Sequence, residues 1–245
     1  MIYMVIKMDK IEKLQEYINN SNYIVFFGGA GVSTESGIKD FRGKNGLYKE
    51  RNNNYPPEYM LSHSCLLNNP ELFFTYYREN MNSLKAKPNI THKYLKRLED
   101  LNKLKVIITQ NIDGLHTLAG NKNVLEIHGS ILDNYCMKCH KKYNKDYIFE
   151  SSGIPKCSCG GIVRPNVILY EEKLPNAFNL AIDYIRKADL LIVAGTSLMV
   201  SPANYLVEEF HGKHLVILNL DATPYDHYAD LVINKPLKDI FSKLK

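Results

Sequence analysis

Four cysteines lie close together in the chain, as two pairs whose spacing suits the binding of a metal ion. The first pair is Cys136-x-x-Cys139 and the second is Cys157-x-Cys159, with seventeen residues between the pairs. Two such pairs can converge on one ion, and four thiolates in a tetrahedral arrangement favour zinc. Because four protein ligands leave no open coordination position, the predicted zinc is structural and not catalytic. The alternatives are four separate thiols, or His140 as a competing ligand.

A second candidate for chemistry is His128, which follows the apolar run at residues 124–127 and precedes Gly129. The run predicts a buried strand, and ligands of open α/β sheets bind just beyond the carboxyl ends of the strands. A histidine there titrates near neutral pH and can act as a general base. From its position alone, a histidine with a purely structural role is the commoner interpretation.

A glycine-rich stretch, Gly28-Gly29-Ala30-Gly31, follows another apolar run at residues 23–27. Glycines after a buried strand let the backbone turn sharply and approach a phosphate, and the next segment can open a helix whose free N–H groups face the anion. The pattern predicts a dinucleotide ligand, with a plain turn as the alternative. The spacing is not G-x-G-x-x-G, because Thr34 stands third after Gly31. The acid, aromatic and base of residues 40–42 favour a ligand, since a plain turn needs no such succession.

The elements that must position these residues alternate between strands and helices. Apolar runs predict strands at 23–27, 105–109, 124–127, 190–194, 215–219 and 231–233. Apolar residues at helical spacing predict helices around 11–18, 94–101 and 178–185. Ser201 followed by Pro202 predicts a helix N-cap with proline in the first helical position. The alternation predicts an α/β fold with a doubly wound parallel, Rossmann-like sheet.

The composition restricts the class of protein. The chain has 245 residues, of which 45% are hydrophobic and 23% charged, as in ordinary globular proteins. Its net charge of +5 is spread along the sequence, so we expect a solvated surface and no direct nucleic-acid binding.

No apolar run approaches the roughly 20 residues that span a bilayer, so no membrane association is expected. The apolar start is short and interrupted by Lys7, which argues against a signal peptide; we expect a cytoplasmic protein that begins at Met1 or Met8. Including Cys65 the chain has five cysteines, and an odd number of cysteines in a cytoplasmic protein favours metal binding over disulfides.

Several segments resemble, in order, the motifs of the sirtuins, which are NAD-dependent protein deacylases. The stretch from Gly28 to Arg42 resembles their NAD-binding loop, residues 109–116 resemble the second motif, and residues 126–130 resemble the motif of the catalytic histidine. The segments 195–198 and 202–203, followed by Asn219, resemble the adenosine-side motifs. The motifs span residues 23 to 221 with the four cysteines among them, so the resemblance covers most of the chain.

The resemblance implies a function as an NAD-dependent protein lysine deacetylase. NAD would be the co-substrate, one zinc ion per chain would be structural, and acyl-lysine proteins or peptides would be the partners. The oxygen of an acyl-lysine attacks the anomeric carbon of NAD as nicotinamide leaves, and His128 then acts as general base towards a ribose hydroxyl, so that lysine and O-acyl-ADP-ribose are released. The alternatives are mono-ADP-ribosyl transfer and a deacylase that prefers longer apolar acyl chains. A hydride-transferring dehydrogenase and a non-enzymatic zinc module are disfavoured.

The resemblance also implies a smaller domain made of two insertions that pack together. Residues 43–92 would form a helical module and residues 132–163 a zinc-binding module. The Rossmann-like NAD-binding domain would comprise residues 1–42, 93–131 and 164–245.

The resemblance assigns roles to particular residues. His128, Asn111 and Asp113 are the implied catalytic residues. The implied NAD-contacting residues are Gly29, Ala30, Gly31, Thr34, Phe41, Arg42, Gln110, Asn111, Ile112, Asp113, His128, Gly195, Thr196, Ser197 and Asn219. Val167 and Leu169 match the segment that pairs with the substrate backbone, although core packing is an equal alternative for Leu169. His116 is interpreted as structural support.

Two departures from the family pattern stand out. Gly28 replaces a common threonine, and Tyr170-Glu171-Glu172 replaces the commoner Phe-Gly-Glu.

The sequence also predicts the acyl preference. Sirtuins that prefer acidic acyl groups carry a Tyr-x-x-Arg pair in the smaller domain, where this chain has Phe74 and Tyr77. Arg78 comes one residue late, about 100° around a helix. We therefore expect a preference for acetyl over succinyl.

Overall fold

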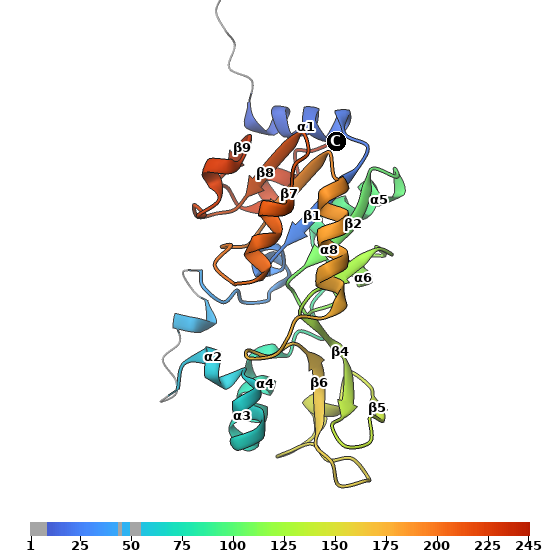
Figure 1. Ribbon diagram of the computed structural model, residues 1–245, viewed down its shortest axis with the longest axis vertical. Coiled ribbons are helices and arrows are strands. Elements are labelled where there is room, and N and C mark those ends of the chain that lie inside the picture. Colours follow the sequence, from blue (N-terminus) through green and yellow to red (C-terminus); the bar gives the residue numbers. More distant parts are fainter. Residues whose placement is uncertain (1–8, 44–45, 50–54) are drawn as a thin grey trace, which may run out of the picture.

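The structure is a computed structural model that describes residues 9–43, 46–49 and 55–245 (Figure 1). The apolar start at residues 1–6, with Met8, lies outside the described residues, as do residues 44–45 and 50–54 of the first insertion. In Figure 1 a part built on a large sheet lies above a part made of short helices and a small sheet.

The large sheet has six parallel strands in the order β3-β2-β1-β7-β8-β9. The strands are β1 (Ile24–Gly28), β2 (Leu104–Thr109), β3 (Val124–Glu126), β7 (Leu190–Ala194), β8 (His214–Leu218) and β9 (Leu231–Ile233). This arrangement confirms the predicted fold class. The direction of the strand order reverses between β1 and β7, and ligands of such sheets bind outside the strand ends at this reversal.

Helices cover both faces of the large sheet. Alternate side chains of β1 point to opposite faces, so Phe26 and Phe27 belong to different hydrophobic clusters. The Phe26 cluster includes residues of α1 (Lys10–Asn20), α5 (Ile90–Asp100) and α9 (Leu237–Phe241). The Phe27 cluster includes residues of α8 (Asn176–Lys187) and the 3-10 helix at Ala203–Glu209. The longest helices, α4 and α8, have 12 residues, so no helix in the described part of the chain is long enough to cross a membrane.

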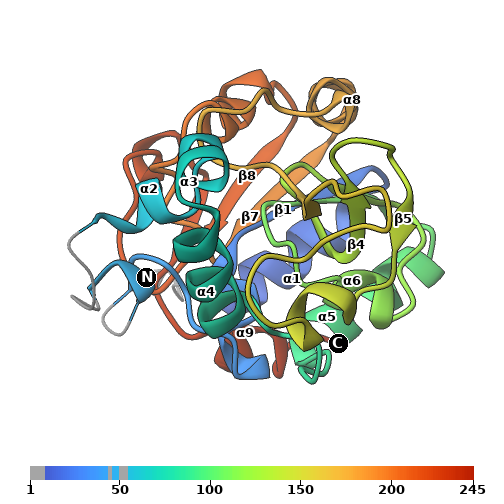
Figure 2. The same cartoon turned by 90° about the horizontal axis from the view of Figure 1, so that it is seen from below.

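The smaller part combines residues from both predicted insertions. Its helices are α2 (Pro57–Met60), α3 (His63–Asn68), α4 (Pro70–Met81) and α7 (Tyr147–Glu150), and its antiparallel strands are β4 (Gly129–Cys136), β5 (Lys142–Tyr143) and β6 (Val163–Val167). Seen from below, α2–α4 lie on one side and β4 and β5 on the other (Figure 2). One hydrophobic cluster joins them, with Phe73 and Phe74 from α4 and Ile131 and Val163 from the strands.

The expectation of a helix after the glycine-rich stretch is wrong. Two 3-10 turns, Ala30–Val32 and Thr34–Ser36, occupy this place. Hydroxyl side chains here compete for backbone groups, since Thr34 Oγ1 donates to the Gly31 carbonyl at 3.0 Å. The turn ends at Gly37, whose φ of 85° is left-handed.

Two smaller helix predictions also need correction. The predicted Ser201 N-cap is wrong, because Pro202 takes the N-cap position with φ −89° and ψ 4°, and the helix that follows is a 3-10 helix. Leu101 lies beyond the end of α5 and is 58% exposed, so it does not belong to the buried face of that helix.

Candidate active site and candidate zinc site

A cleft of about 1390 Å³ opens at the carboxyl ends of β1, β2 and β7 and continues to residues of the smaller part, including Tyr77 and Met81. Pockets for drug-sized ligands measure about 300–1,000 Å³, and this cleft is larger, so it has room for a dinucleotide and part of a second ligand. Every residue predicted to contact the cofactor or the substrate lines this cleft, except Gly29, which is buried beneath it.

Glycines at the strand ends allow two loops to touch. An added Cβ on Gly31 would lie 2.7 Å from Gly195 Cα, and one on Gly29 would lie 2.7 Å from Thr196 Cβ. Gly195 itself has a φ of 60°, and Gly31 N donates to its carbonyl at 2.8 Å. Glycine is therefore required here for the contact between the loop after β1 and the loop after β7.

A hydrogen-bond network joins the first loop to the segment after β2. Asn111 Nδ2 donates to the Gly29 carbonyl at 3.0 Å and to Ser33 Oγ at 3.1 Å. Ser33 Oγ donates to Asp113 Oδ2 at 2.6 Å, and Asp113 Oδ1 accepts from Leu115 N at 2.9 Å. Burial raises the pKa of Asp113, and the bonds from Ser33 and Leu115 oppose that rise. Asn111 and Asp113 thus hold the glycine loop in place while they also border the cleft.

His128 follows β3 directly, and its Nδ1 lies 3.0 Å from the Gln110 carbonyl. A carbonyl only accepts, so Nδ1 carries the proton and Nε2 is left with a free lone pair. Burial lowers the pKa of His128, and the bond to Gln110 opposes this. The ring is therefore neutral at pH 7, which is the state that a general base requires. Next to it, Gly129 has a φ of 76°, and an added Cβ would lie 2.2 Å from the Asn166 carbonyl.

The segment predicted to meet substrate lies directly beside the histidine. Gly129 pairs with Val167 across β4 and β6, and Ile168 N donates to the His128 carbonyl at 2.8 Å. Val167 and Leu169 are each 5% exposed, belong to the hydrophobic cluster of the smaller part and border the cleft. Core packing and a place in the cleft are therefore compatible for Leu169.

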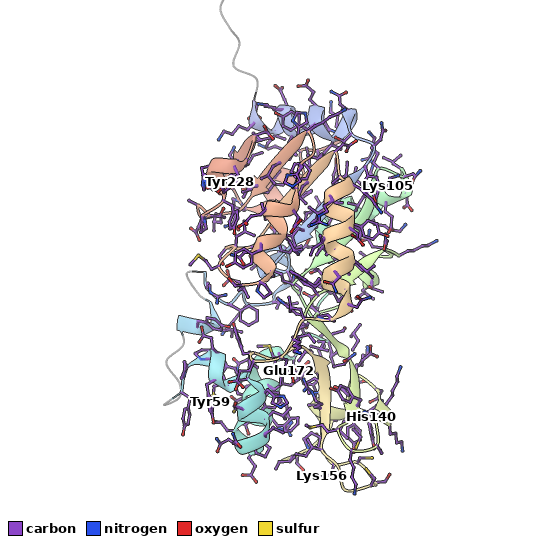
Figure 3. All side chains as sticks on the ribbon, in the orientation of Figure 1. Tyr59, Lys105, His140, Lys156, Glu172 and Tyr228 are labelled. Atoms are coloured by element: carbon purple, nitrogen blue, oxygen red, sulfur yellow. The ribbon has the colours of Figure 1, made fainter. Side chains whose placement is uncertain are left out.

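A buried ion pair secures this segment. The Glu172 carboxylate accepts two bonds from the Arg164 guanidinium and one from Leu169 N at 2.9 Å, and it also meets His63 Nδ1 at 2.8 Å. Arg164 donates further to the Val167 carbonyl at 2.8 Å. Burial alone would raise the pKa of Glu172, but these partners outweigh it and hold the pKa at about 2. Figure 3 places Glu172 at the junction of the two parts.

Glu171 stands where the commoner pattern has glycine. Its φ is 75°, a left-handed conformation that glycine tolerates more easily. Its carboxylate accepts from Ser64 N at 2.9 Å and from Ser64 Oγ at 2.6 Å, which ties the segment to the start of α3. These bonds offset the backbone strain in this chain.

Phe41 and Arg42 follow the glycine-rich stretch in the chain and also line the cleft. Phe41 packs edge-on against Tyr48, with ring centroids 5.5 Å apart, and the Arg42 guanidinium lies 4.9 Å from the centroid of the same ring. Asp40 accepts from Gly43 N at 3.2 Å, which orders this loop. Arg42 is exposed, so it offers a cation to the cleft.

Polar groups also line the part of the cleft that is formed by the loops after β7 and β8. Thr196 Oγ1 donates to Gln110 Oε1 at 3.3 Å, which links the loops after β7 and β2. Asn219 follows β8, and its Nδ2 donates to the Asp221 carbonyl at 2.8 Å. Ser197 and Asn219 both border the cleft.

The four cysteines of the predicted metal site lie together in the smaller part, where Cys136 ends β4. Their sulfur atoms all lie within 4.8 Å of one another, with 3.5 Å between Cys136 and Cys159 and 3.6 Å between Cys139 and Cys157. These distances are too long for a disulfide and close to the roughly 3.8 Å expected between thiolates around a tetrahedral zinc ion. His140 is not part of this group. In Figure 3 the zinc loops, marked by His140 and Lys156, lie far from Glu172 at the cleft.

The sequence did not indicate the contacts that brace this site. Ser33 and Glu172 stand within segments that resemble the family, but their bonds to Asp113 and Arg164 join residues 80 and 8 positions apart and have no pattern of their own. His116 packs 4.6 Å from His92, both rings are buried, and neither ring nitrogen of His116 has a hydrogen-bond partner in the described structure. Burial therefore lowers the pKa of His116, and the ring sits in the core as a neutral group.

Comparison with known proteins assigns the family. The Sir2 family profile matches residues 29–202. The chain belongs to the Sir2 family. It is 54% identical over 240 residues to an NAD-dependent protein deacetylase of Clostridium perfringens, which covers 96% of this chain and 98% of that protein. It is 54% identical over 231 residues to an NAD-dependent protein deacetylase of Clostridium acetobutylicum, covering 93% and 94%.

Solved Sir2 structures share the fold. A structure described as a Sir2–p53 peptide–NAD+ complex has a TM-score of 0.84 and 37% identity, covering 96% of this chain and 97% of that one. A Sir2 protein bound to an acetylated peptide has a TM-score of 0.84, 36% identity and the same coverage. The family resemblance predicted from the motifs is therefore confirmed.

Proposed function

We propose that this Sir2 protein is an NAD-dependent protein lysine deacetylase, with acyl-lysine proteins or peptides as its substrates. One observation carries the proposal: the glycine loop, the segment 110–113, His128 and the segment 167–169 come from distant parts of the chain and border one cleft. The names of its relatives and the ligands of the solved Sir2 structures support the same activity.

The cleft fits a dinucleotide in size and chemistry. It combines hydroxyl groups of Thr34, Thr196 and Ser197 with the cation of Arg42 and the amide of Asn219. We assign these residues, with Gly29, Ala30, Gly31, Phe41, Gln110, Ile112 and Gly195, to NAD binding. When bound, NAD supplies an electrophilic ribose carbon and the ADP-ribose that accepts the acyl group.

The residues around His128 define the proton transfer. The Gln110 carbonyl holds Nδ1 protonated, so Nε2 of His128 accepts the proton from a ribose hydroxyl. Asn111 and Asp113 keep the glycine loop in position and form the wall beside the reacting centre. Val167 ends β6 and borders the cleft together with Leu169, so we assign this segment to pairing with the substrate backbone.

The cysteine cluster fits a structural zinc ion, because four thiolates satisfy a tetrahedral ion and leave no position for substrate. We further propose the two-domain division given by the sequence, with the Rossmann-like domain at 1–42, 93–131 and 164–245, a helical module at 43–92 and a zinc module at 132–163. Three elements cross these bounds: α5 begins at Ile90 in the helical module, β4 begins at Gly129 before the zinc module, and β6 ends at Val167 after it. A cytoplasmic location is proposed for the protein.

Incubation with NAD and an acetyl-lysine peptide tests the function. We expect nicotinamide, deacetylated peptide and O-acetyl-ADP-ribose in equal amounts by mass spectrometry. ADP-ribose attached to the peptide would instead indicate mono-ADP-ribosyl transfer, and the absence of all these products would refute the proposal.

A further inference from the structure

A second, smaller pocket lies between the 3-10 helix at Ala203–Glu209 and the connection from β8 to β9. Asn204 and Glu208 border it from the helix, and Tyr228 borders it from the connection. The pocket measures about 350 Å³ and shares no lining residue with the cleft. Figure 3 places Tyr228 on the part built on the large sheet, away from Glu172 at the junction. Ligand pockets measure about 300–1,000 Å³, so this one suits a single side chain and not a dinucleotide.

Aromatic rings form the wall of the pocket on the side of the β8–β9 connection. The ring centroids of His227 and Tyr228 lie 3.9 Å apart, and those of Tyr225 and Tyr228 lie 6.0 Å apart. The faces of tyrosine rings attract cations. Tyr228 is 64% exposed, and Met199, which also lines the pocket, is 61% exposed. Two large exposed side chains at one pocket favour contact with a protein.

Two acceptor atoms beside the pocket lack a donor. Tyr225 OH donates to Glu208 Oε1 at 2.8 Å, and Asn204 Nδ2 donates to Tyr225 OH at 3.3 Å. Burial and the bond to Glu208 raise the pKa of Tyr225 to about 12, so its hydroxyl stays protonated and donates to the carboxylate. The other carboxylate oxygen, Oε2, has no partner among the described contacts, and Asn204 Oδ1 is buried without a partner there. The pocket therefore favours a ligand that carries N–H donors.

The charge of the pocket is opposite to that of the whole chain. The chain has a net charge of +5, yet no lysine or arginine is found among the lining residues in the described structure. The adjacent Glu209 pairs with Arg186 at 2.7 Å, whereas Glu208 forms no ion pair with the described residues. A carboxylate beside aromatic rings and without a cation of its own favours a cationic ligand. Arginine fits best, because its planar guanidinium stacks on aromatic rings and donates two parallel bonds to a carboxylate.

We propose that this pocket binds the arginine side chain of a protein partner, with the guanidinium donating to Glu208 and stacking on Tyr228. Met199 then contacts the apolar residues next to that arginine. Because Met199 lies in the same loop as Thr196 and Ser197, the partner docks beside the cleft without entering it. The site is separate from those assigned to NAD and to the acyl-lysine peptide, so the interaction goes beyond the proposed deacetylase activity.

Nuclear magnetic resonance tests the proposal by titration of the whole protein with the peptide acetyl-Leu-Arg-Leu-amide, which contains no acetyl-lysine. We expect saturable shifts of the amide signals of Met199 and Tyr228. The same peptide with citrulline, which keeps the shape of arginine but is neutral, should bind at least about fivefold more weakly. Lysine should also bind more weakly, because an ammonium group cannot form the paired bonds. The absence of a saturable shift up to about 10 mM peptide, or equal affinity for the citrulline peptide, would overturn the proposal.

Glu208→Gln and Glu209→Gln form a matched pair of variants. Glutamine at position 208 still accepts from Tyr225, and Glu208 is exposed, so this variant loses the charge and keeps the fold. Its affinity for the arginine peptide should fall about fivefold, whereas Glu209→Gln should bind as the wild-type protein does. Equal affinities of both variants would contradict the assignment. Butylguanidine separates a protein partner from a free small cation: the peptide should bind at least about fivefold more tightly, and equal affinity would refute a protein partner.

Discussion

Replacing Glu172 by glutamine should reveal how strongly the ion pair with Arg164 holds the peptide-side segment. The pKa of Glu172 lies at about 2, against 4.5 for an ordinary glutamate. A pKa held this far below the ordinary value corresponds to about 3 kcal/mol of stability at pH 7. The Glu172 and Arg164 side chains are only 17% and 6% exposed, so removing one charge strands the other in the interior, which typically costs about 3–5 kcal/mol. We therefore expect Glu172→Gln to lower the free energy of unfolding by about 3 kcal/mol.

The pH dependence of the free energy of unfolding shows whether the charge on Glu172 causes this stabilisation. Since the folded-state pKa is depressed, the stabilisation is complete above about pH 5 and is lost as the pH falls towards 2. By linkage, the wild-type protein should lose about 2 kcal/mol of this contribution between pH 7 and pH 3, and Glu172→Gln should lose none of it. Urea denaturation followed by circular dichroism at several pH values measures both free energies.

Glu171→Gln is the neighbouring control, because the exposed Glu171 bonds only Ser64 among the described contacts and should matter less. If Glu172→Gln costs less than about 1 kcal/mol, or its effect does not change with pH, the ion-pair argument is wrong.

Three further outcomes follow from the site. His128→Ala should lower the rate of deacetylation about 100- to 10,000-fold while the circular dichroism spectrum is retained, and near-normal product formation by the variant would show that the role is misassigned. The kcat/KM of the wild-type protein should fall as the pH drops through the lowered pKa of His128, because the protonated ring cannot act as a base. Cys157→Ala should reduce zinc content, measured by plasma mass spectrometry, and lower the melting temperature, because thiolate ligation contributes folding free energy; active wild-type protein without zinc would contradict this. Acetyl peptides should exceed succinyl peptides at least about tenfold in kcat/KM, since Phe74 and Tyr77 offer no cation to a buried carboxylate; equal rates would refute the pocket argument.

The sequence predicted the elements whose signals are local. All six strands of the large sheet lie within short apolar runs, and β1 and β7 are buried along their whole length, so these strands could be found without a structure. The small sheet was missed, because β5 has two residues and β4 mixes buried and exposed positions without regular alternation. A helix after Gly31 was expected from geometry that is common in dinucleotide folds, but the hydroxyl residues that follow favour turns.

In the candidate site, too, residues with local sequence signals could be predicted, whereas contacts between distant segments could not. Its cleft-lining residues stand in contiguous motifs and could be named in advance. The bonds that hold them, such as Ser33 to Asp113 and Arg164 to Glu172, depend on how distant segments meet and leave no pattern in the sequence. Tyr170 was noted in the sequence only as a departure from the family pattern, and its hydrogen bond to Tyr48 could be found only from the structure.

The order of strands in the large sheet has a consequence for synthesis on the ribosome. Strand β1 is central and pairs with β7, for example at Phe26 and Ile192, so one of its edges stays open until nearly four-fifths of the chain has been made. The helices α2–α4 and both cysteine pairs emerge during that interval. A nascent chain thus carries an apolar strand with an unpaired edge while its zinc ligands are already complete, which makes interrupted translation products prone to aggregate. Supply of zinc during translation, before β7 appears, would secure the smaller part first.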